Sequence, residues 1–278
     1  MLAKDYIVSI VAEKVRIWHR DWKQKTKQPM FLGICGPPGS GKTTLANNLR
    51  QTLTDINNIR VVVVSLDDFY LPHSQQCDLS SRFQDNPLLR YRGNPGTHST
   101  DLLTEVCEQL RSGAVGAECS LPVFDKSLNQ GRGDRLPINS WSRVLLPVDV
   151  VIFEGTFVGA FADEITVPLS SELVVINGFL RNYEKAFSFL THFIMLESQQ
   201  LSSVCEWRTQ QEHGLAQAYP DRVVLSDLQV QDFVDRFLPV LTYYYPRIIA
   251  KLAEAKPYEN YLRLVLDQGR SIKAIYSE

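Results

Sequence analysis

The sequence has little of what would place it in several protein classes. Its 5 cysteines are an odd number, lie far apart and include no Cys-x-x-Cys pair, so we expect reduced thiols and not a disulfide framework. Its 5 histidines never take metal-ligand spacing, which argues against a structural zinc site. The 29 basic and 31 acidic residues leave a net charge of −2, which favours neither nucleic acid nor an acidic membrane as a partner.

Long apolar runs are also missing. No window of about eighteen residues is uninterruptedly apolar, so we expect no membrane span, no export signal and a cytoplasmic protein. There is no internal repeat and no low-complexity linker. A chain of 278 residues with 44% hydrophobic and 22% charged residues is typical of a globular protein, and we predict a single domain over residues 1–278.

Short apolar runs alternate with helical patterns along the chain. Apolar spacing predicts a helix within residues 1–29 that packs on the core. Runs typical of buried strands lie at 31–35, 61–66, 148–153, 193–196 and 261–266. Helical patterns occupy 44–53 and 102–110, and Ser226 with Gln229 forms a capping box before another. This alternation predicts an α/β fold with a mainly parallel central sheet between layers of helices.

A glycine-rich segment follows the first of these strands. It contains two glycines five residues apart, Gly36 and Gly41, followed by Lys42 and Thr43. The amides of such a turn and of the following helix N-terminus converge on a polyphosphate. Lys42 would reach the β- and γ-phosphates, and the Thr43 hydroxyl would hold Mg²⁺. The nucleotide-binding residues that we predict are Gly36, Pro37, Pro38, Gly39, Ser40, Gly41, Lys42, Thr43 and Thr44.

Acidic residues end two other strands. Glu154 follows an apolar run in the manner of a metal-supporting strand end. Asp67 and Asp68 follow residues 61–66, where two adjacent carboxylates are costly unless a metal neutralises them or the chemistry uses them. One of the two should be a base, and Asp67 could accept a substrate hydroxyl proton while helping to hold Mg²⁺. In an open parallel sheet these strand ends should emerge beside the phosphate-binding loop.

The connection over residues 67–100 is too long for an inert loop and is a functional candidate. The glycine-rich loop and the two acidic strand ends, at Asp67 and Glu154, together resemble the uridine, pantothenate and phosphoribulose kinase group of P-loop kinases. Three further segments are similar to the D-glycerate 3-kinases and their fungal and bacterial kinase-like relatives: 91–98 (YRGNPGTH), 124–135 (FDKS and GRGDR) and 207–212 (WRTQQE). The similarity runs from about residue 30 to about residue 246.

The resemblance implies a three-layer P-loop NTPase fold with a helical lid at about residues 199–225. It also implies Mg²⁺-dependent transfer of the ATP γ-phosphoryl group to a small hydroxylated molecule. Asp67 matches the catalytic carboxylate, with Lys42 and Arg208 as the other catalytic residues and Thr43, Asp67 and Glu154 as the metal-holding ones. The acceptor-binding residues that it implies are Asp68, Tyr70, Arg92, His98, Asp125, Lys126 and Arg132.

The acceptor is the part of the function that the sequence leaves most open. Arg92, Lys126, Arg132 and Arg135 form a local basic set, which favours an anionic acceptor. D-glycerate is the best single candidate. Thr156, Phe124 and Ser99 depart from residues usual in plant-type glycerate kinases, where tryptophan, tyrosine and aspartate are common. The alternatives are therefore a nucleoside, pantothenate or sugar phosphate kinase, or an ATP-binding regulatory module without acceptor activity.

Two other nucleotide-binding classes are excluded by missing motifs. A regulatory GTPase needs an Asn-Lys-x-Asp element, and an ATP-driven transporter subunit needs a Leu-Ser-Gly-Gly-Gln-like signature; the sequence has neither. The oligomeric state is not predicted.

Overall fold

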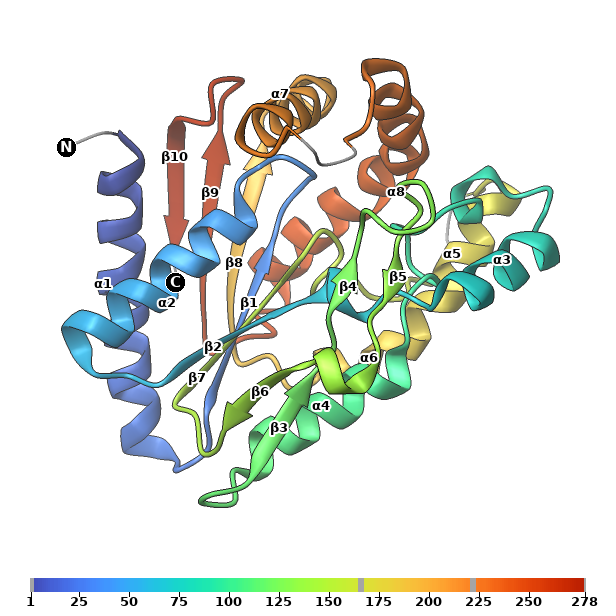
Figure 1. Cartoon of the computed structure of the whole chain (residues 1–278). Coiled ribbons are helices and arrows are strands. Elements are labelled where there is room, and N and C mark those ends of the chain that lie inside the picture. The colour runs from blue at the N-terminus through green and yellow to red at the C-terminus, as the bar shows by residue number, and fades with distance from the viewer. Residues whose placement is uncertain (1–2, 165–167, 221–223, 278) are drawn as a thin grey trace.

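The structure is a computed structural model that describes residues 3–164, 168–220 and 224–277. A six-stranded sheet in the order β10-β9-β8-β1-β7-β2 lies at its centre (Figure 1). The five strands β2, β7, β1, β8 and β9 run parallel, and β10 pairs antiparallel with β9 at one edge. The strands are β1 (Met30–Cys35), β2 (Val61–Ser65), β7 (Val150–Gly155), β8 (His192–Ser198), β9 (Asn260–Leu266) and β10 (Ile272–Ser277). The predicted α/β fold with a mainly parallel sheet is confirmed.

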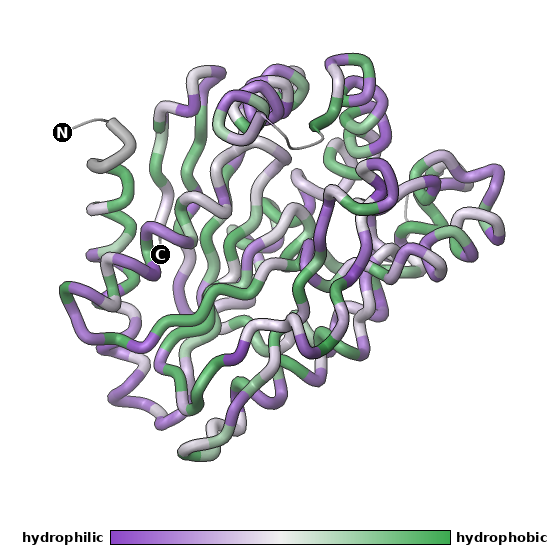
Figure 2. Tube along the Cα trace, viewed as in Figure 1, coloured by the Kyte–Doolittle hydropathy of each residue, from purple (hydrophilic) through white to green (hydrophobic). Residues whose placement is uncertain are grey.

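The central strands are apolar on both faces because helices cover both sides of the sheet. Every residue of β1 and β7 is buried, and Figure 2 shows hydrophobic colour along the strands in the middle of the molecule. A strand covered on both faces cannot alternate apolar and polar residues, which is why continuous apolar runs predicted these strands.

Two helices cover one face of the sheet. They are α1 (Ala3–Lys25) and α2 (Lys42–Asn57). Val11, Val15 and Trp18 of α1 pack in one cluster with Leu45 and Leu49 of α2 and with side chains of four sheet strands. The predicted N-terminal helix therefore lies on the core over its described residues, while residues 1 and 2 fall outside them.

The opposite face carries the larger apolar cluster. The helices there are α4 (Thr100–Ser112), α5 (Ser171–Leu180), α6 (Glu184–Phe187) and α8 (Asp227–Glu254). The predicted capping box is confirmed: Ser226 accepts from the Gln229 backbone N–H, and the Gln229 side chain accepts from the Ser226 backbone. Tyr244 and Tyr245 of α8 are buried in this cluster, so both side chains belong to the core.

Several elements were not predicted, because their sequences lack a long periodic pattern. The helical ones are α5, α6, η1 (Leu66–Phe69), α3 (His73–Arg82), η2 (Pro87–Leu89), η3 (Ile138–Ser140) and η4 (Arg181–Tyr183). The edge strand β10 was not predicted either. Two hairpins pair β3 (Glu118–Leu121) with β6 (Ser142–Leu145) and β4 (Phe124–Asp125) with β5 (Asp134–Arg135). The long connection after residue 67 therefore contains α3 and two short 3-10 turns.

The region predicted as a lid, residues 199–225, contains α7 (Ser203–Ala218). Its residues 221–223 lie outside the described residues. Among the helices that the structure describes, none has the length and apolarity needed to cross a membrane.

Candidate active site

The carboxyl ends of three neighbouring strands meet at a cavity of about 410 Å³. β1 leads into the glycine-rich loop, β7 carries Glu154 as its second-last residue, and β2 is followed by Leu66 and Asp67. In the register of the sheet, Ile34 and Ser65 both pair with Glu154, which places the three strand ends side by side. The cavity lining includes residues 38–44, Asp67 and Glu154.

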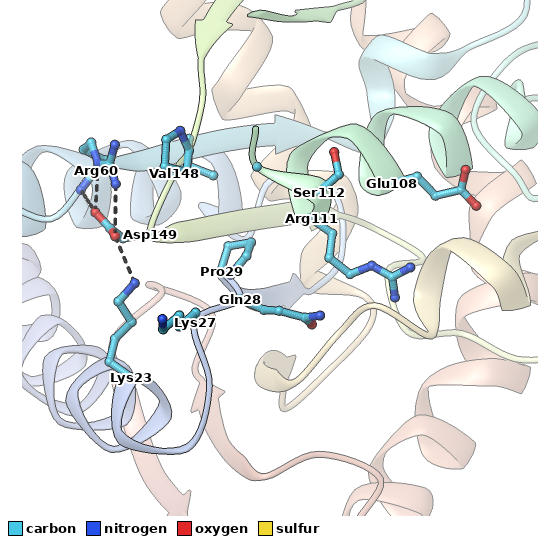
Figure 3. Close-up of a pocket in the computed structure, with 12 residues that line it drawn as sticks. Lys23, Lys27, Gln28, Pro29, Arg60, Glu108, Arg111, Ser112, Val148 and Asp149 are labelled. Atoms are coloured by element: carbon cyan, nitrogen blue, oxygen red, sulfur yellow. Dashed lines mark hydrogen bonds and ion pairs between the residues drawn. The ribbon is translucent and has the colours of Figure 1, made fainter. Parts of the chain in front are cut away.

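A larger cavity, of about 750 Å³, lies at the opposite ends of the strands, where its lining includes Pro29, Arg60 and Asp149 (Figure 3). Its lining is polar, but its main acid is already neutralised: Asp149 pairs with Lys23 at 3.3 Å and with Arg60 at 3.2 Å. It faces the amino ends of the strands, whereas open α/β sheets bind their ligands outside the carboxyl ends. We therefore place the active site at the smaller cavity.

The glycine-rich loop has the geometry of a phosphate-binding turn. Gly39 and Gly41 adopt φ of 76° and 94°, a region that favours glycine, and Gly41 caps α2 without a side chain. The first amides of a helix have no intrahelical acceptor, so the N-terminus of α2 offers donors to an anion at this end of the cavity. The hydroxyl of Ser40 and the Nε of Arg208 are buried without a hydrogen-bond partner among the described residues. Unsatisfied donors that line one cavity fit an anionic ligand.

Glu154 is buried beside the loop, with a hydroxyl group on either side. It is 3% exposed, and its Oε1 accepts hydrogen bonds from Thr43 Oγ1 at 3.0 Å and from Ser65 Oγ at 2.8 Å. Hydroxyl and carboxylate oxygens are the donors that Mg²⁺ prefers. Thr43 and Glu154 therefore fit the metal-holding role predicted for them, and Ser65 is a neighbour that the sequence did not single out.

Lys42 points back into the loop in this structure. Lys42 is 8% exposed, and its ammonium donates to the Pro37 carbonyl at 3.0 Å. Burial lowers the pKa of Lys42, although the charges of Glu154 and Asp67 oppose this shift. The ammonium thus lies at the loop, within the electrostatic influence of both predicted acidic residues.

Asp67 receives two hydrogen bonds from protein side chains. Tyr70 OH donates to its Oδ1 at 3.0 Å, and Lys126 Nζ donates to its Oδ2 at 2.5 Å. Burial raises the pKa of Asp67, but the charge and hydrogen bond of Lys126, together with the smaller effects of His98 and Lys42, hold the pKa below its usual value. Asp67 is therefore a carboxylate under ordinary conditions, which a base must be before it accepts a proton.

A buried network fixes Tyr70 behind the carboxylate. The Tyr70 ring stacks on His98 at 4.5 Å, and His98 Nδ1 lies 2.7 Å from Tyr183 OH. Burial lowers the pKa of His98 to about 3, so the imidazole is neutral. His98 does not line the cavity and contacts the site through Tyr70. Tyr183 was missed because it lies on η4, far along the chain from the motifs.

α7 brings Arg208 to the cavity. Arg208 lines it, stacks over Phe233 at 5.1 Å and forms an ion pair with Glu212. The neighbouring Trp207 is fully buried, and its Nε1 donates to the Gln268 carbonyl at 2.6 Å. Arg208 therefore lines the cavity together with the glycine-rich loop, and closure of the lid region stays a prediction.

Arg270, in the turn between β9 and β10, lines the cavity and was missed by the sequence analysis. Its guanidinium donates to the Gly39 carbonyl at 2.8 Å, to the Trp207 carbonyl at 3.1 Å and to Gln210 Oε1 at 2.8 Å. It thereby joins the phosphate-binding loop to α7. Nothing in its local sequence could have signalled this, because both partners are distant along the chain.

Arg270→Ala is expected to weaken ATP binding by about tenfold or more, because a charge-assisted hydrogen bond that holds the loop is lost. Isothermal titration with a non-hydrolysable ATP analogue measures the effect. Lys273→Ala is the matched control, since Lys273 is a cation of the same hairpin that pairs with Asp267 at 3.2 Å outside the cavity. Equal ATP affinity of Arg270→Ala and Lys273→Ala would contradict the role of Arg270 in holding the phosphate-binding loop against α7.

Gly39→Ala is expected to lower the free energy of unfolding by about 2–3 kcal/mol in the absence of nucleotide. A Cβ at Gly39 would lie 2.7 Å from Trp207 Cβ and 2.8 Å from its backbone carbon, so α7 would have to move. Gly41→Ala has a similar φ but no atom within 4 Å, so it should lose only the about 1–2 kcal/mol of left-handed strain. Chemical denaturation of both variants separates the cost of the clash with Trp207 from the cost of the left-handed backbone strain. Equal losses of unfolding free energy in the two variants would argue against packing of α7 on Gly39.

Other predicted site residues lie around the cavity and not in its lining. Asp68 accepts from the Phe124 backbone N–H at 3.2 Å, and burial raises its pKa to about 6. Asp125 accepts from the Ser127 backbone and hydroxyl, and Arg132 lies over the Tyr91 ring at 5.4 Å. The predicted residues that do not line the cavity are Gly36, Pro37, Asp68, His98, Asp125 and Arg132.

Arg92 and Lys126 do line the cavity. Arg92 donates through NH1 to the carbonyls of Gly131 and Arg132, which holds the loop after β4 near the site. Arg135 instead donates to the carbonyls of Phe69 and Tyr70. The predicted basic set therefore divides into side chains that face the cavity and side chains that support its wall.

The three departures from the plant-type pattern are structural in different ways. The Thr156 carbonyl accepts from Tyr245 OH at 2.9 Å and from Cys35 Sγ at 3.2 Å, and Thr156 lines the cavity. Phe124 packs edge-on against Tyr70 at 5.3 Å. Ser99 precedes α4 without a side-chain cap. Thr156 therefore lies at the cavity wall, and Phe124 contacts Tyr70, which bonds Asp67.

The sequence and fold match known proteins. A family model described as an AAA domain matches residues 24–146. The chain is 33% identical over 276 residues to the uncharacterized kinase mug58 of Schizosaccharomyces pombe, with 95% of this chain and 97% of that protein covered. It is 32% identical over 247 residues to the chloroplastic D-glycerate 3-kinase of Arabidopsis thaliana, with 87% of this chain covered but only 54% of the plant protein, about half its length. Among solved structures, the D-glycerate 3-kinase from Cryptococcus neoformans superposes with a TM-score of 0.86 at 30% identity, covering 98% of this chain and 99% of that one.

Proposed function

Because the chain belongs to the family of P-loop kinases that includes D-glycerate 3-kinase and its fungal kinase relatives, we propose that it phosphorylates a hydroxyl group of a small hydroxy acid, with D-glycerate as the best single candidate. Membership of this family makes the protein an ATP-dependent phosphotransferase. The acceptor and the roles of individual residues are the proposal.

One observation carries the proposal. A single cavity joins the phosphate-binding loop, the Asp67 carboxylate and the cationic side chains of Arg92, Lys126 and Arg208. Phosphoryl transfer needs a polyphosphate site, a group that receives the hydroxyl proton and cations that stabilise the charge on the transferring group. The surplus of cations over what the phosphates need favours an acceptor that carries its own negative charge.

Each residue has a role that its position supports. The loop amides, Lys42 and Arg208 bind and orient the phosphates, and Lys42 and Arg208 stabilise the negative charge of the γ-phosphoryl group. Asp67 accepts the proton of the acceptor hydroxyl as its oxygen attacks phosphorus. Tyr70 holds the carboxylate through Oδ1, and Lys126 bonds the other oxygen, Oδ2.

Mg²⁺ would be held by Thr43 and Glu154, and Asp67, which lines the same cavity, is the third residue that could contribute. When bound, Mg²⁺ would supply positive charge that offsets the negative charge of the phosphates.

The test is a panel of acceptors incubated with the purified protein and Mg-ATP. The panel holds D-glycerate, uridine, pantothenate and ribulose 5-phosphate, and both ADP and the phosphorylated product are measured. We expect D-glycerate to give the highest kcat/KM, with one ADP formed per phosphorylated product. A higher kcat/KM for another member would replace the acceptor while retaining the kinase.

ATP binding without turnover on any acceptor would instead support a regulatory module. In that case a titration with ATP should still produce saturable binding that depends on the glycine-rich loop.

A further inference from the structure

Both carboxylate oxygens of Asp67 already have a protein donor. Tyr70 OH bonds Oδ1, and Lys126 Nζ bonds Oδ2 at 2.5 Å. A general base has to lie within about 2.6–3.2 Å of the proton that it removes. Each oxygen keeps a second acceptor site, but an incoming hydroxyl group meets a carboxylate whose negative charge is already shared with two donors, one of them an ammonium ion. The base is therefore fully available to the hydroxyl proton only when one of the two donors moves aside.

Tyr70 cannot move easily. It is 5% exposed, its ring stacks on His98, and Phe124 packs against its edge. His98 is held in turn by Tyr183. Displacement of Tyr70 would disturb a packed and hydrogen-bonded core, which is costly.

Lys126 is the donor that can leave. Its side chain is 44% exposed and reaches Asp67 from the loop after β4 through four rotatable bonds. A partly exposed ion pair is weak compared with a buried one, so a competing anion can exchange for Asp67.

Nothing else in the cavity wall offers Lys126 a second anion. Among the described residues that line the cavity, the carboxylates are Asp67 and Glu154, and Glu154 is engaged by Thr43 and Ser65. The nearby Arg92 and Arg208 are cations and repel the ammonium. The anion that draws Lys126 away must come with a ligand.

We propose that Lys126 selects the acceptor: its ammonium covers the Asp67 carboxylate until a hydroxy acid brings a carboxylate that pairs with it, and water and neutral alcohols are thereby refused. This inference rests on the proposed function, because it assigns to the same site the reason for preferring an anionic acceptor. Lys126 is then both the ligand of the acceptor carboxylate and the residue that exposes the base.

The reaction steps balance. When Lys126 pairs with the acceptor carboxylate, Asp67 Oδ2 takes the hydroxyl proton, the acceptor oxygen bonds to the γ-phosphorus, and the bond from phosphorus to the bridging oxygen of ADP breaks. The products are the phosphorylated hydroxy acid and ADP, and Asp67 later releases the proton to solvent. With water as the attacking group the same steps give inorganic phosphate and ADP.

The experiment compares D-glycerate with glycerol, which has the same three-carbon skeleton but no carboxylate, and with water alone. In Lys126→Met, kcat/KM for D-glycerate should fall by about a hundredfold as an ion pair to the substrate is lost. Acceptor-free ATP hydrolysis and glycerol phosphorylation should both rise by about tenfold, since the base is uncovered. Lys126→Arg keeps a cation on Asp67 and should keep both side reactions low.

Faster ATP hydrolysis in Lys126→Met cannot come from misfolding. Two further sets of measurements test whether it comes from the uncovered base. The thermal unfolding temperature and the affinity for an ATP analogue should match those of the wild type. The increase should disappear in the double variant Asp67→Asn/Lys126→Met, because the hydrolysis requires the base.

The proposal is overturned if Lys126→Met loses D-glycerate turnover while water and glycerol rates stay the same or fall, since Lys126 would then only bind substrate. Rapid acceptor-free hydrolysis by the wild type would also overturn it, since ATP alone would be uncovering the base. If D-glycerate is not an acceptor at all, the proposed function fails, yet the comparison of acceptor-free hydrolysis between wild type and Lys126→Met still decides the role of Lys126.

Discussion

Asp67→Asn is expected to lower kcat by about 10²–10⁴-fold while ATP affinity stays within about threefold of the wild type. The amide keeps the size of the side chain and can still accept the Tyr70 hydrogen bond, but it cannot take up a proton. Asp67 lies at the end of β2 beside the phosphate-binding loop, where an attacking hydroxyl would approach the γ-phosphate. Steady-state kinetics with D-glycerate and a separate binding titration with an ATP analogue measure the two quantities.

Asp68→Asn makes the same atomic change one residue further along. Asp68 does not line the cavity, and its carboxylate holds the Phe124 backbone of β4. We expect kcat to change by less than about tenfold, because the proton acceptor itself is intact. A loss in Asp68→Asn as large as that in Asp67→Asn, or near-normal turnover in Asp67→Asn, would remove Asp67 from the role of base.

The parts of the site that could be predicted from the sequence are those written in contiguous residues. Residues 36–44 form a loop whose glycine positions and following helix depend on local geometry, and the structure places seven of these nine residues, 38–44, in the cavity lining. Asp67 and Glu154 were found because each ends an apolar strand, and parallel strands bring their carboxyl ends together. These predictions needed only strand direction and a motif.

The parts that were missed depend on contacts between distant segments. Arg270 reaches the loop from the turn between the last two strands, and Tyr183 reaches His98 from a short 3-10 helix. Neither stands in a pattern, because an arginine in a turn and a tyrosine near a helix end are usual anywhere. Only the three-dimensional order of the sheet, with β9 and β10 on the far side of β8, brings that turn to the cavity.

The same reasoning explains the acceptor-binding residues that do not line the cavity. The resemblance to known kinases assigns acceptor binding to a whole segment of the chain. The side chains of such a segment point in different directions, and along a strand they alternate between its two faces. In residues 124–126, Lys126 faces the cavity, whereas Asp125 closes a turn with Ser127 and Phe124 packs on Tyr70. A motif therefore locates the wall of a site more securely than it locates each side chain that touches substrate.

Lys42→Ala is expected to lower kcat/KM for ATP by about 10²–10³-fold and to weaken ATP binding by about tenfold or more, because the ammonium contacts the phosphates in both the ground state and the transition state. The ammonium is buried, lies 3.0 Å from the Pro37 carbonyl and is within the field of Glu154 and Asp67. The nucleotide-free protein should lose little stability, since a buried charge that is costly to desolvate has been removed. The rise in unfolding temperature that ATP gives to the wild type should be much smaller in the variant.

Lys42→Met separates charge from packing, because it keeps most of the hydrocarbon chain and removes only the ammonium. If the charge is responsible, Lys42→Met and Lys42→Ala should show the same loss of ATP affinity and rate, measured by titration and steady-state kinetics. Recovery in Lys42→Met would assign the effect to packing of the loop. Wild-type affinity and rate in either variant would mean that the loop does not bind the β- and γ-phosphates, and the electrostatic basis of the catalytic site would have to be sought elsewhere in the cavity.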